Sequence, residues 1–241
     1  MSARRFFLEG THFDGDTVTI AGKDAHKIVR VLRLQSGDRI EVVDSAATVF
    51  DAELIVDNAT VHAVLRDGRG SLDAARVQID VAQAVPKGQK MDFIVEKLSE
   101  LGVSAILPFE SERCIARGVA GTKVERWRRL AQSAAQQSGR TNIPLIKDVT
   151  SYDALLERFS SYDLVLFPWE VADPLPLREV LPGLVQNTQR VLVVVGPEGG
   201  FSHGEAASAQ NAGAAIVSLG HQILRTETAA LYVVSILMYL M

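Results

Sequence analysis

The sequence predicts an α/β fold built on a parallel sheet that is covered by helices. From residue 76 onward, short aliphatic runs alternate with segments of helical periodicity, which is the pattern of strand–helix–strand units. The run Val191–Val195 is apolar at every position, as in a strand that is buried on both faces. Before residue 70, short strands dominate instead. Two domains are therefore predicted, at 1–70 and 71–241.

The N-terminal part is predicted to be a small β-rich unit. Its runs of strand-forming residues are separated by Gly-Asp and Asp-Asn turn signals. The predicted strands cover residues 17–20, 39–44, 52–56 and 61–65. The stretch 67–71 is rich in glycine and charge, so it is the predicted linker to the second domain.

Residues 25–34 lie between the first two strands and are predicted to form a helix. His26, Arg30 and Arg33 stand at positions i, i+4 and i+7, which places three potential cations on one helical face. Such a face is typical of a helix that binds phosphate, but also of a solvated surface. The sequence leaves both interpretations open.

The C-terminal part predicts strands and helices in alternation. Strands are predicted at 76–84, 103–109, 163–170, 191–195 and 214–220. Helices are predicted at 91–101, 124–137, from 203 onward and at 226–240. Gly102 is expected to stop the first of these helices. Ser202 and Glu205 have the spacing of a capping box, which predicts the start of the third.

Three of the strand ends are candidates for one ligand pocket. Phe167–Glu170, Gly196–Gly200 and Leu219–Arg225 each follow an aliphatic strand, and parallel strands bring their carboxyl ends to one edge of the sheet. Glycine lets a ligand approach the backbone closely, because no Cβ stands in the way. The glycine spacing fits neither the dinucleotide fingerprint nor the P-loop, which argues against both ligand classes. A turn without any ligand remains the alternative.

The cluster Arg225–Thr228 lies between a strand end and an apolar helix. Thr226 is predicted to cap that helix, and the positive helix end would stabilise Glu227. A cation is electrostatically misplaced at a helix N-terminus, so capping does not account for Arg225. Arg225 is therefore the stronger functional candidate, suited to a phosphate, a carboxylate or a developing anion.

Composition and charge narrow the classes of partner and site. The net charge of −4 argues against a generally basic surface for nucleic acid, but residues 85–140 carry ten Lys and Arg against six Asp and Glu. This basic third is typical of a local polyanion site or of a solvated helical face. Cys114 is the only cysteine and the five histidines lack metal spacing, so no metal site is predicted. No signal peptide or membrane span is expected, which predicts a cytoplasmic protein.

Two C-terminal motifs carry a resemblance to a known family. Val195–Ser202 followed by Leu219–Ala229 resembles the RsmE family, the SPOUT-superfamily methyltransferases that act on N3 of a uridine in 16S ribosomal RNA. The likeness covers nearly the whole chain. It also includes Arg4–Phe7, His26 to Arg33 with Gly37-Asp38, Lys87, Glu96 to Gly102, Ser111–Arg113, Gln137–Arg140 and Pro144. The chain departs from the family at Gln136, where Glu is frequent, and at Gln222, where Arg is frequent.

The resemblance implies an architecture and a cofactor. It implies an N-terminal PUA-like β-barrel that binds RNA and a C-terminal SPOUT α/β domain tied in a deep trefoil knot. It also implies a homodimer with the last helix at its interface, and S-adenosylmethionine held by the knotted loops. The cofactor-binding residues implied by the motifs are Phe167, Gly196, Pro197, Glu198, Gly199, Gly200, Leu219, Gly220, Ile223, Leu224, Arg225, Thr228 and Ala229.

The reaction implied by this resemblance needs stabilisation of an anion. Uridine N3 carries a proton that must leave before or during attack on the methyl group, so charge develops on the edge of the base. Arg225 is the first catalytic candidate for that charge. Glu198 is the second, as a base or as a positioning group, and Glu227 is a weaker one that helix capping explains better.

The RNA partner implied by the resemblance is 16S rRNA within the small ribosomal subunit. The expected RNA contacts are Arg4, Arg5, His26, Arg30 and Arg33 in the first domain, and Lys87, Arg113, Arg126 and Arg140 in the second. Two other functions remain open. One is a SPOUT methyltransferase with another RNA target, and the other is a non-catalytic RNA-binding assembly factor.

Overall fold

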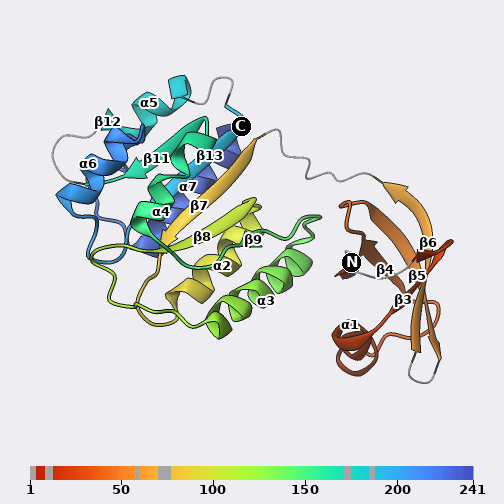
Figure 1. The fold of residues 1–241 in the computed structure, drawn as a ribbon. Helices are drawn as coiled ribbons and strands as arrows, with labels where there is room; N and C mark the ends of the chain where they lie inside the picture. Colours follow the sequence, from red (N-terminus) through yellow and green to blue (C-terminus); the bar gives the residue numbers. More distant parts are fainter. Residues whose placement is uncertain are drawn as a thin grey trace. The chain divides into compact units, whose positions relative to one another are not determined.

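The computed structural model describes residues 4–8, 13–57, 60–69, 77–170, 175–184 and 188–240. The chain forms two units, one made of residues 1–74 with 135–142 and the other of residues 75–134 with 143–241. Each unit has its own sheet (Figure 1). The predicted domain boundary between residues 70 and 71 lies outside the described residues.

The first unit is a mixed sheet with the strand order β1-β4-β5-β6-β3-β2 among its described residues. Its strands are β1 (Arg4–Phe7), β2 (Phe13–Asp14), β3 (Thr17–Ile20), β4 (Arg39–Val43), β5 (Val49–Asp57) and β6 (Thr60–Arg69). Only β1 and β4 pair in parallel. The four predicted strands are confirmed, and β1 and β2 are additional. Alternate residues such as Val18, Leu54 and Val61 point into a buried core.

Two predictions in the first unit are wrong. Residues 25–34 do not form one helix: α1 (Gly22–His26) is followed by a single π-helical turn, η1 (Lys27–Val31). The turn is wider than an α-helical one because the N–H of Leu32 donates to the Lys27 carbonyl, five residues back, at 2.8 Å. Arg33 lies beyond the helix with φ 53°, so it does not share a helical face with His26 and Arg30.

The predicted linker is also corrected by the structure. Residues 67–69 continue strand β6, and the register pairs Arg69 with Val49 and Gly68 with Phe50 of β5. The hydrogen-bonded ladder with β5 satisfies this backbone in spite of its turn-like composition. Gly70 and Ser71, the rest of the predicted linker, lie outside the described residues.

The second unit confirms the predicted α/β class, with a sheet whose strands all pair in parallel. Their order is β10-β8-β7-β13-β11-β14-β12, and β9 pairs with β8. The strands are β7 (Gln78–Ala84), β8 (Ala105–Glu110), β9 (Leu145–Ile146), β10 (Thr150–Ser151), β11 (Leu164–Pro168), β12 (Leu175–Pro176), β13 (Arg190–Val195) and β14 (Ala215–Ser218). Strands β9, β10 and β12 have two residues each and were not predicted, because so short a run carries no periodicity.

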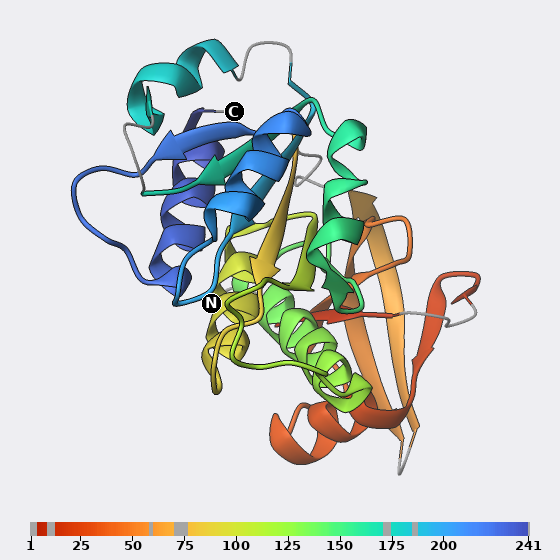
Figure 2. The ribbon, with the colours of Figure 1, turned by 60° about the vertical axis from the view of Figure 1, so that its left-hand side comes forward.

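Helices cover both faces of this sheet. They are α2 (Lys90–Leu101), α3 (Gly121–Ser138), α4 (Tyr152–Leu156), the 3-10 helix η2 (Phe159–Ser161), α5 (Leu177–Leu184), α6 (His203–Asn211) and α7 (Thr226–Leu240). The four predicted helices are confirmed, and α6 starts with the predicted capping box. Figures 1 and 2 show α6 and α7 on opposite faces of the sheet.

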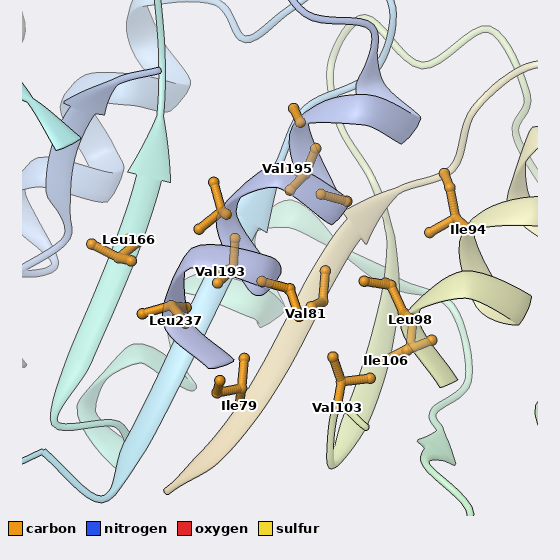
Figure 3. Packing of buried hydrophobic residues seen from close by; sticks show 14 of the residues in the cluster. Ile79, Val81, Ile94, Leu98, Val103, Ile106, Leu166, Val193, Val195 and Leu237 are labelled. Atoms are coloured by element: carbon orange, nitrogen blue, oxygen red, sulfur yellow. The ribbon is translucent and has the colours of Figure 1, made fainter. Parts of the chain in front are cut away.

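Strand β13 is buried between these two layers. Val191, Val193 and Val195 pack with α2 and α7, as Figure 3 shows for Val193 and Val195. Leu192 and Val194 point to the other face and pack with α4 and α6. Burial on both faces explains why the run contains no polar residue.

Among the described residues, no helix combines the length and the apolar character that a membrane crossing requires. Within the same ranges, no three His, Cys, Asp or Glu side chains are grouped so that they could hold a metal ion.

Candidate functional site

A cavity of about 380 Å³ opens at the carboxyl edge of the parallel sheet. Its walls come from the loops after β11, β13 and β14, together with the first residue of α2 and the start of α7. The volume falls in the range of sites for small molecules. The three loops that the sequence places at one edge therefore meet around one cavity.

The loop after β13 forms one wall through a tight turn. The N–H of Gly200 donates to the Pro197 carbonyl at 2.9 Å, and Ser202 then starts helix α6. The Phe201 ring packs against the buried Phe167 ring, with 4.2 Å between their centroids. A Cβ on Gly196 would lie 2.9 Å from Phe201, so this position needs glycine.

The loop after β14 forms a second wall. Gly220 has φ +119°, a conformation that residues with a side chain rarely adopt. Its N–H donates to the Ser218 hydroxyl at 3.1 Å, which fixes the start of the loop. Leu219, Ile223 and Leu224 then give the wall an apolar surface, and Ile223 is exposed.

A buried hydrogen-bond chain joins these walls to the centre of the sheet. The Gln83 amide of β7 donates to the Thr226 hydroxyl at 2.8 Å, and that hydroxyl donates to the Gly196 carbonyl at 2.6 Å. Gln83 is fully buried, and its Oε1 has no hydrogen-bond partner in the part of the chain that the structure describes. These two hydrogen bonds hold the start of α7 against the loop after β13.

An ionic cluster lies at the cavity wall around Glu198. Its carboxylate accepts hydrogen bonds from the Lys87 N–H at 3.1 Å and from the Lys90 ammonium at 2.9 Å. Partial burial raises the pKa of Glu198. The hydrogen bonds from Lys90 and Lys87 lower the pKa by more, so the pKa of Glu198 lies below the usual value for glutamate. Glu198 is therefore a stable anion at neutral pH. The Lys90 ammonium also lies 3.9 Å from Glu227 Oε2, which is buried and makes no hydrogen bond to any described residue.

Arg225 lines the same cavity with an exposed side chain. Among the described residues it makes neither a salt bridge nor a side-chain hydrogen bond, whereas its backbone carbonyl accepts from the Ala229 N–H at 2.8 Å. The guanidinium is thus anchored through its backbone and free to bind an anion.

Most residues of the predicted cofactor set border the cavity. Those on its lining are Gly196, Pro197, Glu198, Gly200, Leu219, Gly220, Ile223, Leu224, Arg225 and Ala229. Three residues of the set lie elsewhere. Phe167 is fully buried behind Phe201, and Gly199 turns its carbonyl to Arg113. Thr228 lies on the other side of α7, beside Tyr232.

The predicted RNA contacts of the first unit differ in solvent exposure and in whether they pair with an acidic residue. Arg4, His26, Arg30 and Arg33 are exposed. Arg5 is only 11% exposed and forms an ion pair with Glu41 at 2.8 Å. Its charge already has a partner within the protein, and the role of Arg5 as an RNA contact stays a prediction.

The predicted RNA contacts of the second unit also differ. The Lys87 side chain is exposed, and Arg126 is exposed but paired with Asp92 at 2.7 Å. Arg113 donates to the Gly199 carbonyl at 3.0 Å, so it braces a cavity loop. Arg140 is half-buried.

Sequence reasoning missed residues that line the cavity, such as Lys90 and Thr226. Trp169 and Glu170 also line it; they belong to one of the three predicted pocket loops but not to the predicted cofactor set. One signal in the sequence could have pointed to Lys90. Like Arg225, it is a cation at the N-terminus of a helix, where a positive charge neither caps the helix nor is favoured by its dipole.

Comparison with known proteins gives two family matches. Residues 73–238 match the RNA methyltransferase domain family, and residues 20–71 match the RNA methyltransferase PUA domain family. Together these matches span most of the chain and meet close to the linker that the sequence suggested.

Individual relatives carry one consistent name. The chain is 30% identical to ribosomal RNA small subunit methyltransferase E of Bacillus subtilis, over 98% of this chain and 96% of the relative. It is 29% identical to the Mycobacterium tuberculosis protein of the same name, over 95% of this chain and 89% of the relative. A crystal structure of the Neisseria gonorrhoeae protein of that name, bound to S-adenosyl methionine, superposes with a TM-score of 0.88. That match has 29% identity and covers 99% of this chain and 98% of the other.

Proposed function

We propose that this chain, which belongs to the ribosomal RNA small subunit methyltransferase E (RsmE) family, methylates N3 of a uridine in the RNA of the small ribosomal subunit. The protein is an S-adenosylmethionine-dependent rRNA methyltransferase. The uridine and its N3 atom are the proposed part. The observation that carries this part is the Arg225 guanidinium on the wall of the cavity, which pairs with none of the described residues.

The cavity has the chemistry that S-adenosylmethionine requires. Gly196, Gly200 and Gly220 leave backbone groups accessible, as a nucleoside needs when it is held by main-chain hydrogen bonds. Leu219 and Leu224 supply apolar surface for an adenine ring. Side chains of both signs line the same wall and suit the charged amino-acid end of the molecule. When bound, the cofactor supplies a methyl group on a sulfonium.

Arg225 is proposed to act on the methyl acceptor. A uracil that loses its N3 proton carries negative charge over N3 and the two neighbouring carbonyl oxygens. A fixed guanidinium beside those atoms stabilises the charge where it develops, which is the largest single contribution in many enzymes. The carbonyl of Arg225 is fixed by the first turn of α7, so the guanidinium starts from an ordered position.

For RNA binding we propose the exposed basic residues in each unit. Arg4, His26, Arg30 and Arg33 would contact phosphate in the first unit, and Lys87 in the second. Contacts of this kind position an RNA without reading its sequence. Because they release counterions, the affinity for RNA should fall steeply as salt is added.

We also propose the finer architecture that the family resemblance implies. The first unit would be a PUA-like barrel, which the family match of residues 20–71 and the six-strand order support. The second would be a SPOUT domain with a trefoil knot. In support, the chain after β13 runs through α6 to β14 and returns as α7 to contact α2 and β13. The enzyme would act in the cytoplasm.

One experiment tests the proposed reaction. The protein is incubated with labelled S-adenosylmethionine and small ribosomal subunits that lack the modification, and the labelled nucleotide is mapped. We expect one methyl group on N3 of a single uridine. A label on another atom or base would contradict the proposal, and absence of transfer would favour a non-catalytic RNA-binding factor.

A variant tests the role of Arg225 in the same assay. Arg225→Ala should lower the rate of transfer by about 10²–10³-fold, the usual loss when one group that stabilises an anion is removed. Arg129→Ala, on an exposed face of α3, is the matched control. Full turnover by Arg225→Ala would remove Arg225 from the mechanism.

A further inference from the structure

Lys90 is a second cation on the cavity wall, and the family resemblance assigned it no role. It is the first residue of α2, where the positive end of the helix disfavours a cation. Its side chain is 38% exposed, and it reaches Glu198 rather than solvent alone. A lysine that is kept in an unfavourable field and oriented by a carboxylate is a candidate for binding a ligand anion.

Glu198 orients Lys90 and is itself fixed. Its carboxylate accepts from the Lys87 backbone N–H at 3.1 Å and from Lys90 at 2.9 Å. Both bonds fall on Oε1, and such donors lower the pKa of the carboxyl group, which makes Glu198 a weak general base. An ammonium has three donor hydrogens, and Glu198 takes one of them. Two donors of Lys90 therefore remain for other partners, since Glu227 lies too far away for a hydrogen bond, at 3.9 Å.

We propose that Lys90 is a catalytic residue whose ammonium donates to one carbonyl oxygen of the target uracil, while Arg225 contacts the other, and that Glu198 is a positioning residue for Lys90. This inference rests on the proposed function. Uracil N3 is flanked by the carbonyl oxygens O2 and O4, which share the charge of its anion. The two cations come from different walls, one from α2 and the other from the loop before α7. Together they can serve both oxygens.

The proposed step balances without a protein base. The N3–H proton leaves to hydroxide from solvent and forms water, and the electron pair stays on the uracil. That pair then forms the bond between N3 and the methyl carbon, while the carbon–sulfur bond breaks and its electrons remain on sulfur. Lys90 and Arg225 keep their protons throughout. Their contribution is to make the N3 anion more stable and therefore more abundant in the complex.

The test uses Lys90→Gln and an electronic change in the substrate. Single-turnover methylation is measured against pH on unmodified small subunits reconstituted with either uridine-containing or 5-fluorouridine-containing rRNA. Fluorine withdraws electrons and makes the N3 anion easier to form without help. On uridine we expect Lys90→Gln to be slower by about 10²–10³-fold, with its pH profile displaced to higher pH. On 5-fluorouridine, the ratio of the rate of the unmodified protein to the rate of Lys90→Gln should be smaller than on uridine.

Three further measurements separate this role from a structural one. Lys97→Gln, which changes another paired lysine on α2, should keep the rate. Thermal unfolding and the affinity for S-adenosylmethionine, by calorimetry, should change far less for Lys90→Gln than its rate does. Glu198→Gln should show the same substrate dependence with a smaller loss, because Lys90 is retained but less ordered.

The outcomes distinguish this inference from the proposed function. If the unmodified protein does not methylate uridine N3, the proposed function fails and this inference with it. If it does, but Lys90→Gln keeps the full rate, only the inference is overturned. A loss of rate that is equal on uridine and 5-fluorouridine also overturns it, since such a loss reflects positioning of the cavity wall and not stabilisation of the anion.

Discussion

The hydroxyl of Thr226 donates a 2.6 Å hydrogen bond to the carbonyl of Gly196, thirty residues earlier in the chain. The same hydroxyl accepts from the buried amide of Gln83 at 2.8 Å. Three elements are thereby joined at one oxygen atom: the central strand β7, the end of β13 and the start of α7. Two of the loops that form the cavity walls are held together by these hydrogen bonds, so we expect the shape of the cavity to depend on them.

Replacing Thr226 by valine should weaken both the fold and the cofactor site. The change keeps the shape but leaves the Gly196 carbonyl and the Gln83 amide without their partner, which costs about 1–3 kcal/mol. Urea unfolding measures the stability, and calorimetry measures the affinity for S-adenosylmethionine. Thr226→Ser keeps the hydroxyl and is the matched control. Equal stability and affinity of the valine variant and the unmodified protein would contradict this interpretation.

Tryptophan fluorescence should report binding in the cavity. Trp169 lines the cavity, and its ring meets the His203 ring edge-on at 5.3 Å. Trp127, the other tryptophan, is buried in the core and donates to Asp92 at 3.1 Å. Adding S-adenosylmethionine should therefore change the emission of Trp169 alone. Trp127→Phe should keep the change and Trp169→Phe should abolish it; the reverse pattern would place the ligand elsewhere.

Arg113→Ala should lower the affinity for S-adenosylmethionine. The Arg113 guanidinium donates to the Gly199 carbonyl at 3.0 Å and so holds the loop after β13 from outside the cavity. Losing one such bond, worth about 1 kcal/mol, corresponds to roughly a fivefold higher Kd. Calorimetry checks this value, with Arg129→Ala as the control. If RNA affinity fell while the cofactor Kd did not change, Arg113 would be an RNA contact instead of a brace.

The Glu198–Lys90 pair should make stability depend on pH in the acid range. The folded-state pKa of Glu198 is lowered, so its contribution is present above the unfolded value of about 4.3 and is lost as the pH falls through the folded value. Glu198→Gln should therefore be less stable at pH 7 by about 0.5–1 kcal/mol, the range for a partly exposed pair. Unfolding curves at several pH values test this.

The difference in stability between Glu198→Gln and the unmodified protein should narrow below the unfolded value of about 4.3 and close as the pH falls through the lower folded-state pKa of Glu198. Glu157→Gln, which changes an exposed carboxylate outside the cavity lining, is the control. A difference that stays constant down to pH 3 would mean that the Glu198 charge does not stabilise the fold.

Helix α7 should form a dimer interface through its outer face. Leu231, Tyr232, Ile236 and Tyr239 form an apolar surface on α7, and Tyr239 is 89% exposed. Contiguous apolar surface of this kind usually marks an interaction site. Tyr239→Glu should convert a dimer to a monomer in sedimentation experiments, whereas Ile55→Glu, at an exposed position in the first unit, should not. A monomeric unmodified protein would contradict the homodimer that the family resemblance implies.

The sequence predicted best where one physical rule acts alone. The helix at 226–240 has the bounds of α7, because a long apolar run leaves little freedom. The predicted capping role of Thr226 is wrong, because Thr226 is the first residue of the helix and its hydroxyl bonds to Gln83 and Gly196 instead. The capping box of Ser202 and Glu205 and the strand at 191–195 follow from equally local rules. Short elements such as α4 and β12 escaped because a few residues carry too little periodicity.

The sequence failed where long-range pairing overrides local preference. Residues 67–69 have the composition of a linker but extend β6, because β5 offers a ladder of hydrogen bonds. Arg33 continues a helical spacing but lies at φ 53° after a π-helical turn.

The sequence by itself determined the parallel α/β sheet, the three loops at its carboxyl edge and, through two motifs, the family. Only the tertiary structure decided which of the charged side chains are available there. Arg225 is unpaired, Glu198 is fixed as an anion, and Lys90 is turned toward it. Local rules fix where a backbone turns, because turns depend on neighbouring residues. The partner of a charge depends on residues that are distant in the chain and meet only in the folded protein.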